Sequence, residues 1–187
     1  MKNLAFRLLE FKKILVFVIA IFSSYLWAPF ARAEFVYLGG GNGAFNSNAR
    51  VKSLQISSHS EIFNSHLSNH GFKAHLEWSV FDIKGTKSGA NSTVVAGVSP
   101  VLRYGLANDW VFLEFGIGPY FFSEKMISSK EGVGTTFEFG SLVGVGARFG
   151  EKSQFEVGYR LMHFSNAGIS SFNPGVDIQQ IRFGYRF

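Results

Sequence analysis

The 187-residue sequence has no cysteine and few charged residues, and both shortages narrow the choice of protein class. The absence of cysteine excludes disulfide frameworks, thiol nucleophiles and cysteine-based zinc sites. Charged residues make up 17% of the chain, and aromatic residues, with 22 phenylalanines among them, make up another 17%. Disordered chains show the opposite balance, so we expect a folded protein, and the length suits one domain.

Most of the net positive charge lies in the first 33 residues. The whole chain carries +5, but residues 34–187 hold 13 Lys and Arg against 12 acids. Residues 1–33 have a basic start, an apolar stretch at 14–27 and the small-x-small sequence Ala31-Arg32-Ala33, which predict a secretory signal peptide. That apolar stretch falls short of the roughly 20 residues that a transmembrane helix needs. The nearly neutral remainder gives no electrostatic support for a nucleic-acid partner.

After residue 33 the sequence alternates with a period of two. In residues 111–121 the odd positions are apolar or proline, whereas the even positions include Glu114, Gly116 and Gly118. Strands of ten or more residues with one apolar face and one face of glycine and charge are typical of tilted membrane strands. The pattern predicts eight strands, at about 35–42, 51–59, 70–83, 92–105, 110–123, 135–149, 153–166 and 176–187.

These strands predict an all-β fold, an eight-stranded antiparallel up-and-down transmembrane β-barrel at 34–187 after the signal peptide at 1–33. Strands in lipid must close because their edges find no backbone partner, and eight strands make a narrow barrel filled by side chains. Residues 179–187 end in an aromatic and are similar to the C-terminal signature of outer-membrane barrels, which assembly machinery recognises. A soluble β-domain is the alternative.

A serine, a histidine and a carboxylate fall on one face of the last predicted hairpin. His163 and Ser165 share the parity of the outward apolar residues of their strand, and Asp177 shares that of the next strand. An imidazole can take the proton of a hydroxyl nucleophile while a carboxylate fixes its tautomer, which is the chemistry of acyl transfer. Polar groups on a lipid-facing wall are costly and indicate function. A polar rim at the membrane interface is the alternative interpretation.

The predicted topology also gives a depth for this group. With both termini in the periplasm, the strand at 153–166 runs outward, so its far end lies at the outer leaflet of the outer membrane. Lipopolysaccharide occupies that leaflet. The expected substrate is therefore an ester within a lipid, reached laterally from the membrane.

The last hairpin also carries two short motifs, His163-Phe164-Ser165-Asn166-Ala167-Gly168 and Asn173-Pro174-Gly175-Val176-Asp177. They resemble the lipid A 3-O-deacylase family of the PagL type, whose pattern is His-aromatic-Ser-Asn-Ala-Gly followed by Asn-x-Gly-x-Glu. The resemblance extends in layout over residues 34–187. It implies an eight-stranded barrel in the outer membrane of a Gram-negative bacterium that hydrolyses the 3-O-linked acyl chain of lipid A without a cofactor or a metal.

The resemblance also assigns roles and partners. Ser165 would be the nucleophile and His163 the general base and later the acid, while Asn166 and the Gly168 N–H would form the oxyanion hole. The implied partners are lipid A or lipopolysaccharide, outer-membrane lipid and the barrel-assembly machinery, and a homodimer stays open.

The third member of the triad departs from the family pattern. Asp177 stands where the family has Glu, and because its side chain is one methylene shorter, it must approach His163 more closely or through water. Glu124 and Glu131, beside another outer loop, are alternative acids. Residues 66–69, His-Leu-Ser-Asn, repeat the His-x-Ser-Asn order of residues 163–166. No acid follows them at the family spacing, so we interpret them as a solvated periplasmic turn.

Two other functions stay open from the sequence. A non-catalytic barrel serving envelope structure or adhesion would make Ser165 and His163 incidental rim residues. A lipid A acyltransferase or a phospholipase would use the same nucleophile with a different acyl donor or acceptor.

Overall fold

The computed structural model describes residues 33–45, 47–59, 67, 70–87, 89–128 and 131–187. The predicted signal peptide, apart from Ala33, lies outside the described residues, as do His66, Ser68 and Asn69. The strands are β1 (Ala33–Gly43), β2 (Ala49–His59), β3 (Phe72–Gly85), β4 (Ser92–Leu106), β5 (Val111–Phe122), β6 (Phe137–Phe149), β7 (Phe155–Ser165) and β8 (Val176–Arg186). Each predicted strand is present, with ends that agree to within two residues. Over the described ranges, no helix has the length and apolar character to cross a membrane.

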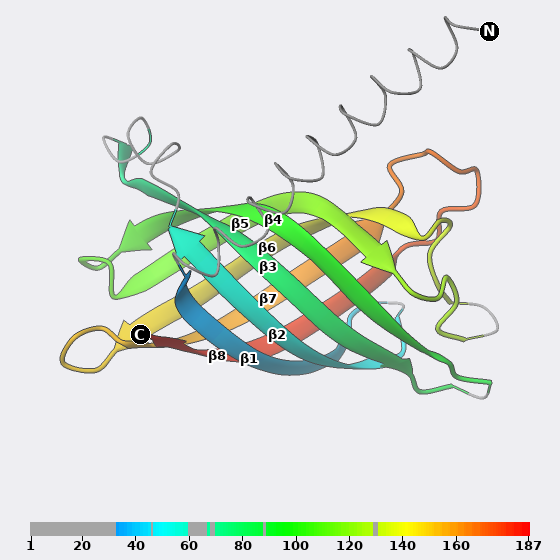
Figure 1. Cartoon of the computed structure of the whole chain (residues 1–187), viewed down its shortest axis with the longest axis horizontal. Coiled ribbons are helices and arrows are strands. Elements are labelled where there is room, and N and C mark those ends of the chain that lie inside the picture. The colour runs from blue at the N-terminus through cyan, green and yellow to red at the C-terminus, as the bar shows by residue number, and fades with distance from the viewer. Residues whose placement is uncertain (1–32, 46, 60–66, 68–69, 88, 129–130) are drawn as a thin grey trace, which may run out of the picture.

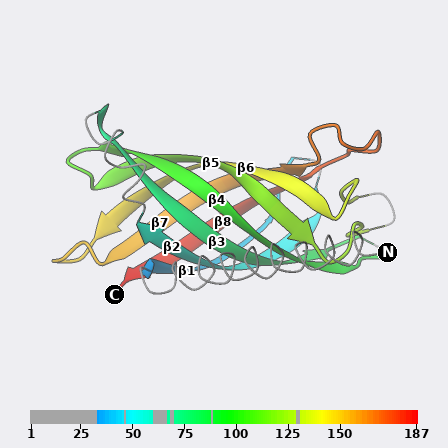
Figure 2. The ribbon, with the colours of Figure 1, turned by 45° about the horizontal axis from the view of Figure 1, so that its top comes forward.

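The eight strands close into one antiparallel barrel. Each strand pairs with the next along the chain, and β1 pairs with β8. The connections β1–β2, β3–β4, β5–β6 and β7–β8 gather at one end, which we call the loop end (Figure 1). The C-terminus and the turns at 107–110 and 150–154 lie at the other end, the terminal end (Figures 1 and 2). The last hairpin thus presents its connection, residues 166–175, at the loop end.

The outward and inward faces follow the alternation read from the sequence. In β7, Glu156, Arg160 and Phe164 are buried inside the barrel, whereas Val157 and His163 are exposed on the outer wall. Large apolar side chains are exposed around this wall, among them Leu38, Ile117, Phe121, Ile181 and Phe183. An apolar outer wall around a filled interior is the arrangement expected of a barrel whose solvent is lipid.

The interior at the terminal half is a network of buried ion pairs. Arg160 donates from Nε to Glu114 at 2.5 Å and from Nη2 to Glu77 at 2.8 Å. Arg182 donates to the same two carboxylates, at 2.8 Å to Glu77 and 2.9 Å to Glu114. The network consists of Glu77, Arg103, Glu114, Arg148, Glu156, Arg160 and Arg182. Buried charges are stable only when paired in this way, so the network is the polar interior that the sequence predicts.

The interior at the loop half is largely apolar instead, with Glu138 and Thr93 as buried polar residues near the rim, and the alternation did not predict this difference. Phe164 packs edge-on against Phe81, Tyr120 and Phe122, with ring centroids 5.2 to 5.9 Å apart. Gly140 makes room for them, because a Cβ there would lie 2.5 Å from the Tyr120 ring. This aromatic layer lies directly inside the wall that carries the candidate site and gives that wall a rigid backing.

Candidate active site

His163 and Asp177 meet on the outer wall at the loop end of the last hairpin. The β7–β8 register places them directly opposite each other. His163 Nδ1 and Asp177 Oδ1 are 2.7 Å apart, a hydrogen-bond distance. The shorter aspartate therefore reaches the imidazole without an intervening water. A carboxylate on Nδ1 fixes the tautomer in which Nε2 can accept a proton.

Ser165 follows His163 on the same outward face of β7. Residues i and i+2 of a strand lie about 6.6 Å apart at Cα, so the hydroxyl is within reach of the imidazole through side-chain rotation. Among the described residues, the Ser165 hydroxyl and the imidazole are not joined by a hydrogen bond. Catalytic pairs often tighten only when substrate binds. The structure thus brings His163 and Asp177 into contact and places Ser165 beside them.

The β1–β2 connection holds the backbone of Asp177 on both sides. The Asp177 N–H donates to Ser47 Oγ at 2.9 Å. The Ala44 N–H donates to the Asp177 carbonyl, also at 2.9 Å. These contacts join parts of the chain 130 residues apart. The sequence carried no signal for them, because no short motif encodes a contact between distant loops.

Asn166 organises the loop that follows Ser165. Its buried side chain accepts the Gly168 N–H at 3.0 Å and the Ser170 N–H at 3.4 Å, and it donates to the Phe172 carbonyl at 3.2 Å. The Asn166 backbone N–H donates to Asn173 Oδ1 at 3.1 Å. The two predicted oxyanion donors, the Asn166 amide and the Gly168 N–H, therefore both bond within this loop.

Gly175 is a second loop residue with a direct bearing on the histidine. A Cβ at this position would lie 2.9 Å from His163 Cε1, and the backbone φ is +74°. Only glycine meets both demands without strain, because other residues rarely adopt this conformation and have no room for a Cβ here.

The alternative acids lie elsewhere. Glu131 accepts hydrogen bonds from Asn48 Nδ2 at 2.8 Å and from Lys87 Nζ at 2.5 Å, so it joins three connections of the loop end. Burial raises the pKa of Glu131, but the hydrogen bonds from Lys87 and Asn48 outweigh it and hold the pKa below its ordinary value. Glu124 is exposed, and its N–H donates to Thr93 Oγ1 at 3.0 Å. Of the acids that the structure describes, Asp177 is the one bonded to His163.

A phenylalanine cluster borders the site on the β5–β6 side. Phe139 pairs directly with Ser165 across the strands. Its ring packs edge-on against Phe137 at 5.3 Å, and Phe137 packs against Phe121 at 5.2 Å. These rings form an apolar surface beside the serine, suited to a hydrocarbon chain.

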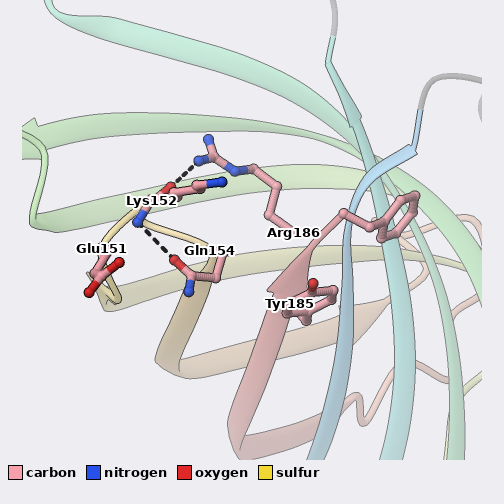
Figure 3. Close-up of a pocket in the computed structure, with 6 residues that line it drawn as sticks. Glu151, Lys152, Gln154, Tyr185 and Arg186 are labelled. Atoms are coloured by element: carbon pink, nitrogen blue, oxygen red, sulfur yellow. Dashed lines mark hydrogen bonds between the residues drawn. The ribbon is translucent and has the colours of Figure 1, made fainter.

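A pocket elsewhere in the barrel does not belong to this site. A pocket at the terminal end is lined by Glu151, Lys152, Gln154, Tyr185, Arg186 and Phe187 (Figure 3). It lies at the opposite end of the barrel from His163. The residues that the structure describes contain no group of three or more His, Asp or Glu that could hold a metal ion.

The fold defines the class of protein. A closed eight-stranded antiparallel barrel with an apolar outer wall is the architecture of small bacterial outer-membrane barrels. In agreement, the chain is similar to the crystal structure of the outer membrane enzyme PagL, with a TM-score of 0.64 and 20% identity over 82% of this chain and 99% of that chain. At this identity, the similarity supports the fold.

The sequence comparison gives the family. The chain belongs to the PagL family, described as lipid A 3-O-deacylase, whose model matches residues 70–186. The lipid A deacylase PagL of Bordetella bronchiseptica is 36% identical over 92 residues, which cover 49% of each chain. PagL of Pseudomonas aeruginosa is 33% identical over 81 residues, 42% of this chain and 45% of that protein. The matched region spans about half the length of these curated relatives. The family predicted from the last hairpin is thus confirmed.

Proposed function

We propose that this protein is an esterase of the Gram-negative outer membrane that hydrolyses the 3-O-linked acyl chain of lipid A, with Ser165, His163 and Asp177 as its catalytic residues. Membership of the PagL family supports the substrate and the compartment. The observation that carries the mechanism is the 2.7 Å contact between His163 and Asp177 on the outward face, beside Ser165. Residues 1–33 serve as the secretory signal and residues 34–187 as the barrel, which the assembly machinery inserts.

The reaction begins with proton transfer from Ser165. His163 Nε2 accepts the hydroxyl proton as Oγ attacks the ester carbonyl, while Asp177 stabilises the imidazolium that forms. The tetrahedral intermediate collapses and the bond between the acyl carbon and the sugar oxygen breaks. His163 gives the proton to this departing oxygen, and the acyl group stays on Ser165. Water then attacks the acyl-enzyme with His163 again as base, which releases the fatty acid and restores Ser165.

The negative charge of the tetrahedral intermediate needs hydrogen-bond donors. We assign this role to the Asn166 amide and the Gly168 N–H, each of which would stabilise the charge by about 3 kcal/mol. Because both donors bond within the loop in the free protein, substrate binding must turn at least one of them toward the oxyanion.

Mass spectrometry of lipid A tests this function. Cells of a Gram-negative host that express the protein should lose one hydroxyacyl mass from lipid A, and Ser165→Ala should abolish the loss. Ser141→Ala is the matched control, because Ser141 faces outward and pairs with His163 from β6. Heat-modifiable migration in gels shows that each variant still folds. Full activity of Ser165→Ala would refute the mechanism. If the wild-type protein leaves the mass of lipid A unchanged, a non-catalytic barrel is favoured. A gained acyl mass would indicate a transferase.

A further inference from the structure

Three cations point outward at the loop half of β2 and β3. Arg50 and Lys52 lie on β2 and Lys84 lies on β3, and all three are exposed. We call them the basic patch. Arg50 pairs directly with Lys84 across the strands, and Lys52 pairs with Asp82. Like charges directly opposite each other are destabilising. Asp82 is exposed opposite Lys52 and offsets part of its charge, whereas Arg50 and Lys84 face each other without an acid between them, so an anionic ligand would relieve the repulsion between these two.

The basic patch is close to the candidate active site around the outer wall. Gln179, the next outward residue after Asp177 on β8, pairs with Asn42 of β1. Asn42 in turn pairs with Arg50. Neighbouring strands lie about 4.8 Å apart, so Arg50 is roughly 10 Å around the wall from β8 and roughly 14 Å from β7, which carries Ser165. A headgroup that contacts Arg50 while its ester lies at Ser165 must therefore extend across β8 and β1.

The outer surface of β1, between the candidate active site and the basic patch, carries small side chains at this level. On β1 its outward residues include Gly40 and Asn42. A Cβ added at Gly40 would meet no atom nearer than the Val51 carbonyl oxygen, at 3.7 Å. This outward glycine is therefore not required by packing, in contrast to Gly41, where a Cβ would lie 1.8 Å from the Gln179 carbonyl oxygen. A headgroup can lie flat across β1 at this level.

The two sides of the site have opposite chemistry. Phe139 and Phe137 border Ser165 on the β6 side, and the basic patch lies on the β2–β3 side. A lipid with an ester between a hydrocarbon chain and an anionic headgroup fits in one orientation only. Its chain lies against the phenylalanines and its headgroup extends over β1.

We propose that the basic patch binds the phosphate groups of the lipid A headgroup and orients the 3-O-ester toward Ser165. This inference rests on the proposed function. Lipid A is an acylated disaccharide that carries phosphate. Arginine and lysine bind phosphate oxygens through charge-assisted hydrogen bonds. Each cation near a membrane surface strengthens the binding of an anionic lipid by roughly fivefold.

Steady-state kinetics on two substrates tests the patch. The full-length protein, refolded in detergent micelles, is given phosphorylated lipid A and the same lipid A after enzymatic removal of its phosphates. For Arg50→Gln, we expect KM on phosphorylated lipid A to rise roughly fivefold, and for the triple variant of Arg50, Lys52 and Lys84 to Gln roughly a hundredfold, with kcat within twofold. KM on the dephosphorylated lipid should not change.

The matched control is Lys152→Gln, which removes one exposed cation from the turn at the terminal end and should leave both KM values unchanged. An equal rise of KM on both substrates, or a loss confined to kcat, would overturn the proposal. If the triple variant does not show heat-modifiable migration, the single variants Arg50→Gln and Lys84→Gln carry the test.

A binding measurement separates this inference from the proposed function. Native mass spectrometry of the Ser165→Ala protein should show phosphorylated lipid A bound more tightly than the dephosphorylated form, and the triple variant should lose the difference. Excess inorganic phosphate or phosphatidylglycerol should not displace the lipid. Displacement by either would show a general anion site and overturn the lipid A assignment. Phosphate-dependent binding without any hydrolysis by wild type would refute the esterase and support phosphate binding by the basic patch. Hydrolysis without a preference for the phosphorylated lipid would support the esterase and refute phosphate binding by the patch.

Discussion

Ser47 holds the backbone of Asp177 from a loop that lies 130 residues away in the sequence. The serine hydroxyl accepts the Asp177 N–H at 2.9 Å, while the Ala44 N–H donates to the carbonyl of the same aspartate. Asp177 is the second residue of β8, where a strand end would otherwise be free to move. Its aim at His163 is therefore set by the β1–β2 connection as well as by its own strand.

Ser47→Ala should lower kcat without a matching change in KM. Loss of a hydrogen bond of about 1 kcal/mol that positions the acid corresponds to a roughly fivefold slower turnover. Ser47→Thr keeps the acceptor and should restore the wild-type rate. Kinetics on lipid A in micelles measure both, and a Ser47→Ala enzyme with unchanged kcat would show that β8 alone positions Asp177.

Asp177→Asn should slow turnover by roughly a hundredfold or more, because an amide at this position no longer favours the imidazole tautomer that accepts the serine proton. Asp177→Glu should retain activity, since glutamate is the residue of the family pattern. Release of the fatty acid, measured at matched amounts of folded barrel, gives both rates. Wild-type activity in Asp177→Asn would move the acid role to another residue.

Gly175→Ala should displace the His163 ring and strain the loop at once. The added Cβ lies 2.9 Å from Cε1 at a φ of +74°. We expect kcat to fall roughly tenfold or more, as small displacements of catalytic groups often cause. Gly89→Ala is the control, because Gly89 has a φ of +72° and no atom within 4 Å of the added Cβ. Equal losses in the two variants would assign the effect to backbone strain alone.

Arg160→Leu should reduce the stability of the barrel and leave the catalytic residues in place. The side chain is fully buried and bonded to Glu77 and Glu114, so its removal leaves two carboxylates short of a partner. We expect the free energy of unfolding to fall by about 3 to 5 kcal/mol. Lys73→Met, which breaks an exposed pair with Asp109, should cost less than about 1 kcal/mol. Urea unfolding in lipid vesicles measures both, and equal effects would contradict a structural role for the network.

Glu131 should make the loop end sensitive to acid. Because its pKa in the folded protein is lowered, its contribution is fully present above its ordinary value of 4.5 and is lost as the pH falls through the lower folded value. Wild type should therefore exceed Glu131→Gln in stability at neutral pH, and the difference should shrink below about pH 4.5. A difference that stays constant into acid would show that the carboxylate charge does not matter.

The strands and their outward faces could be predicted because one local rule, the period of two, decides both. The same parity selected His163, Ser165 and Asp177, since two neighbouring antiparallel strands bring their outward residues together at the shared end. Their register, which sets the 2.7 Å contact, could not be predicted, because the ten-residue connection at 166–175 does not fix which residues of β7 and β8 pair.

The parts that could not be predicted depend on closure of the whole barrel. Ser47 meets Asp177 only because β1 closes against β8, and no pattern in residues 44–48 reports it. The aromatic layer around Phe164 was missed for a similar reason. Inward positions of one strand do not reveal which inward positions of distant strands they will face.

The buried ion network has a consequence for how the barrel is assembled. A slip of β7 by one residue would turn Arg160 and Glu156 to the outer wall and bring Tyr159 inside. An arginine at the bilayer midplane costs about 2 to 4 kcal/mol, and the carboxylates left inside would lose their partner. A shifted register therefore costs free energy both at the outer wall and in the interior. The buried arginines and glutamates thus favour one alignment of the strands when the barrel closes.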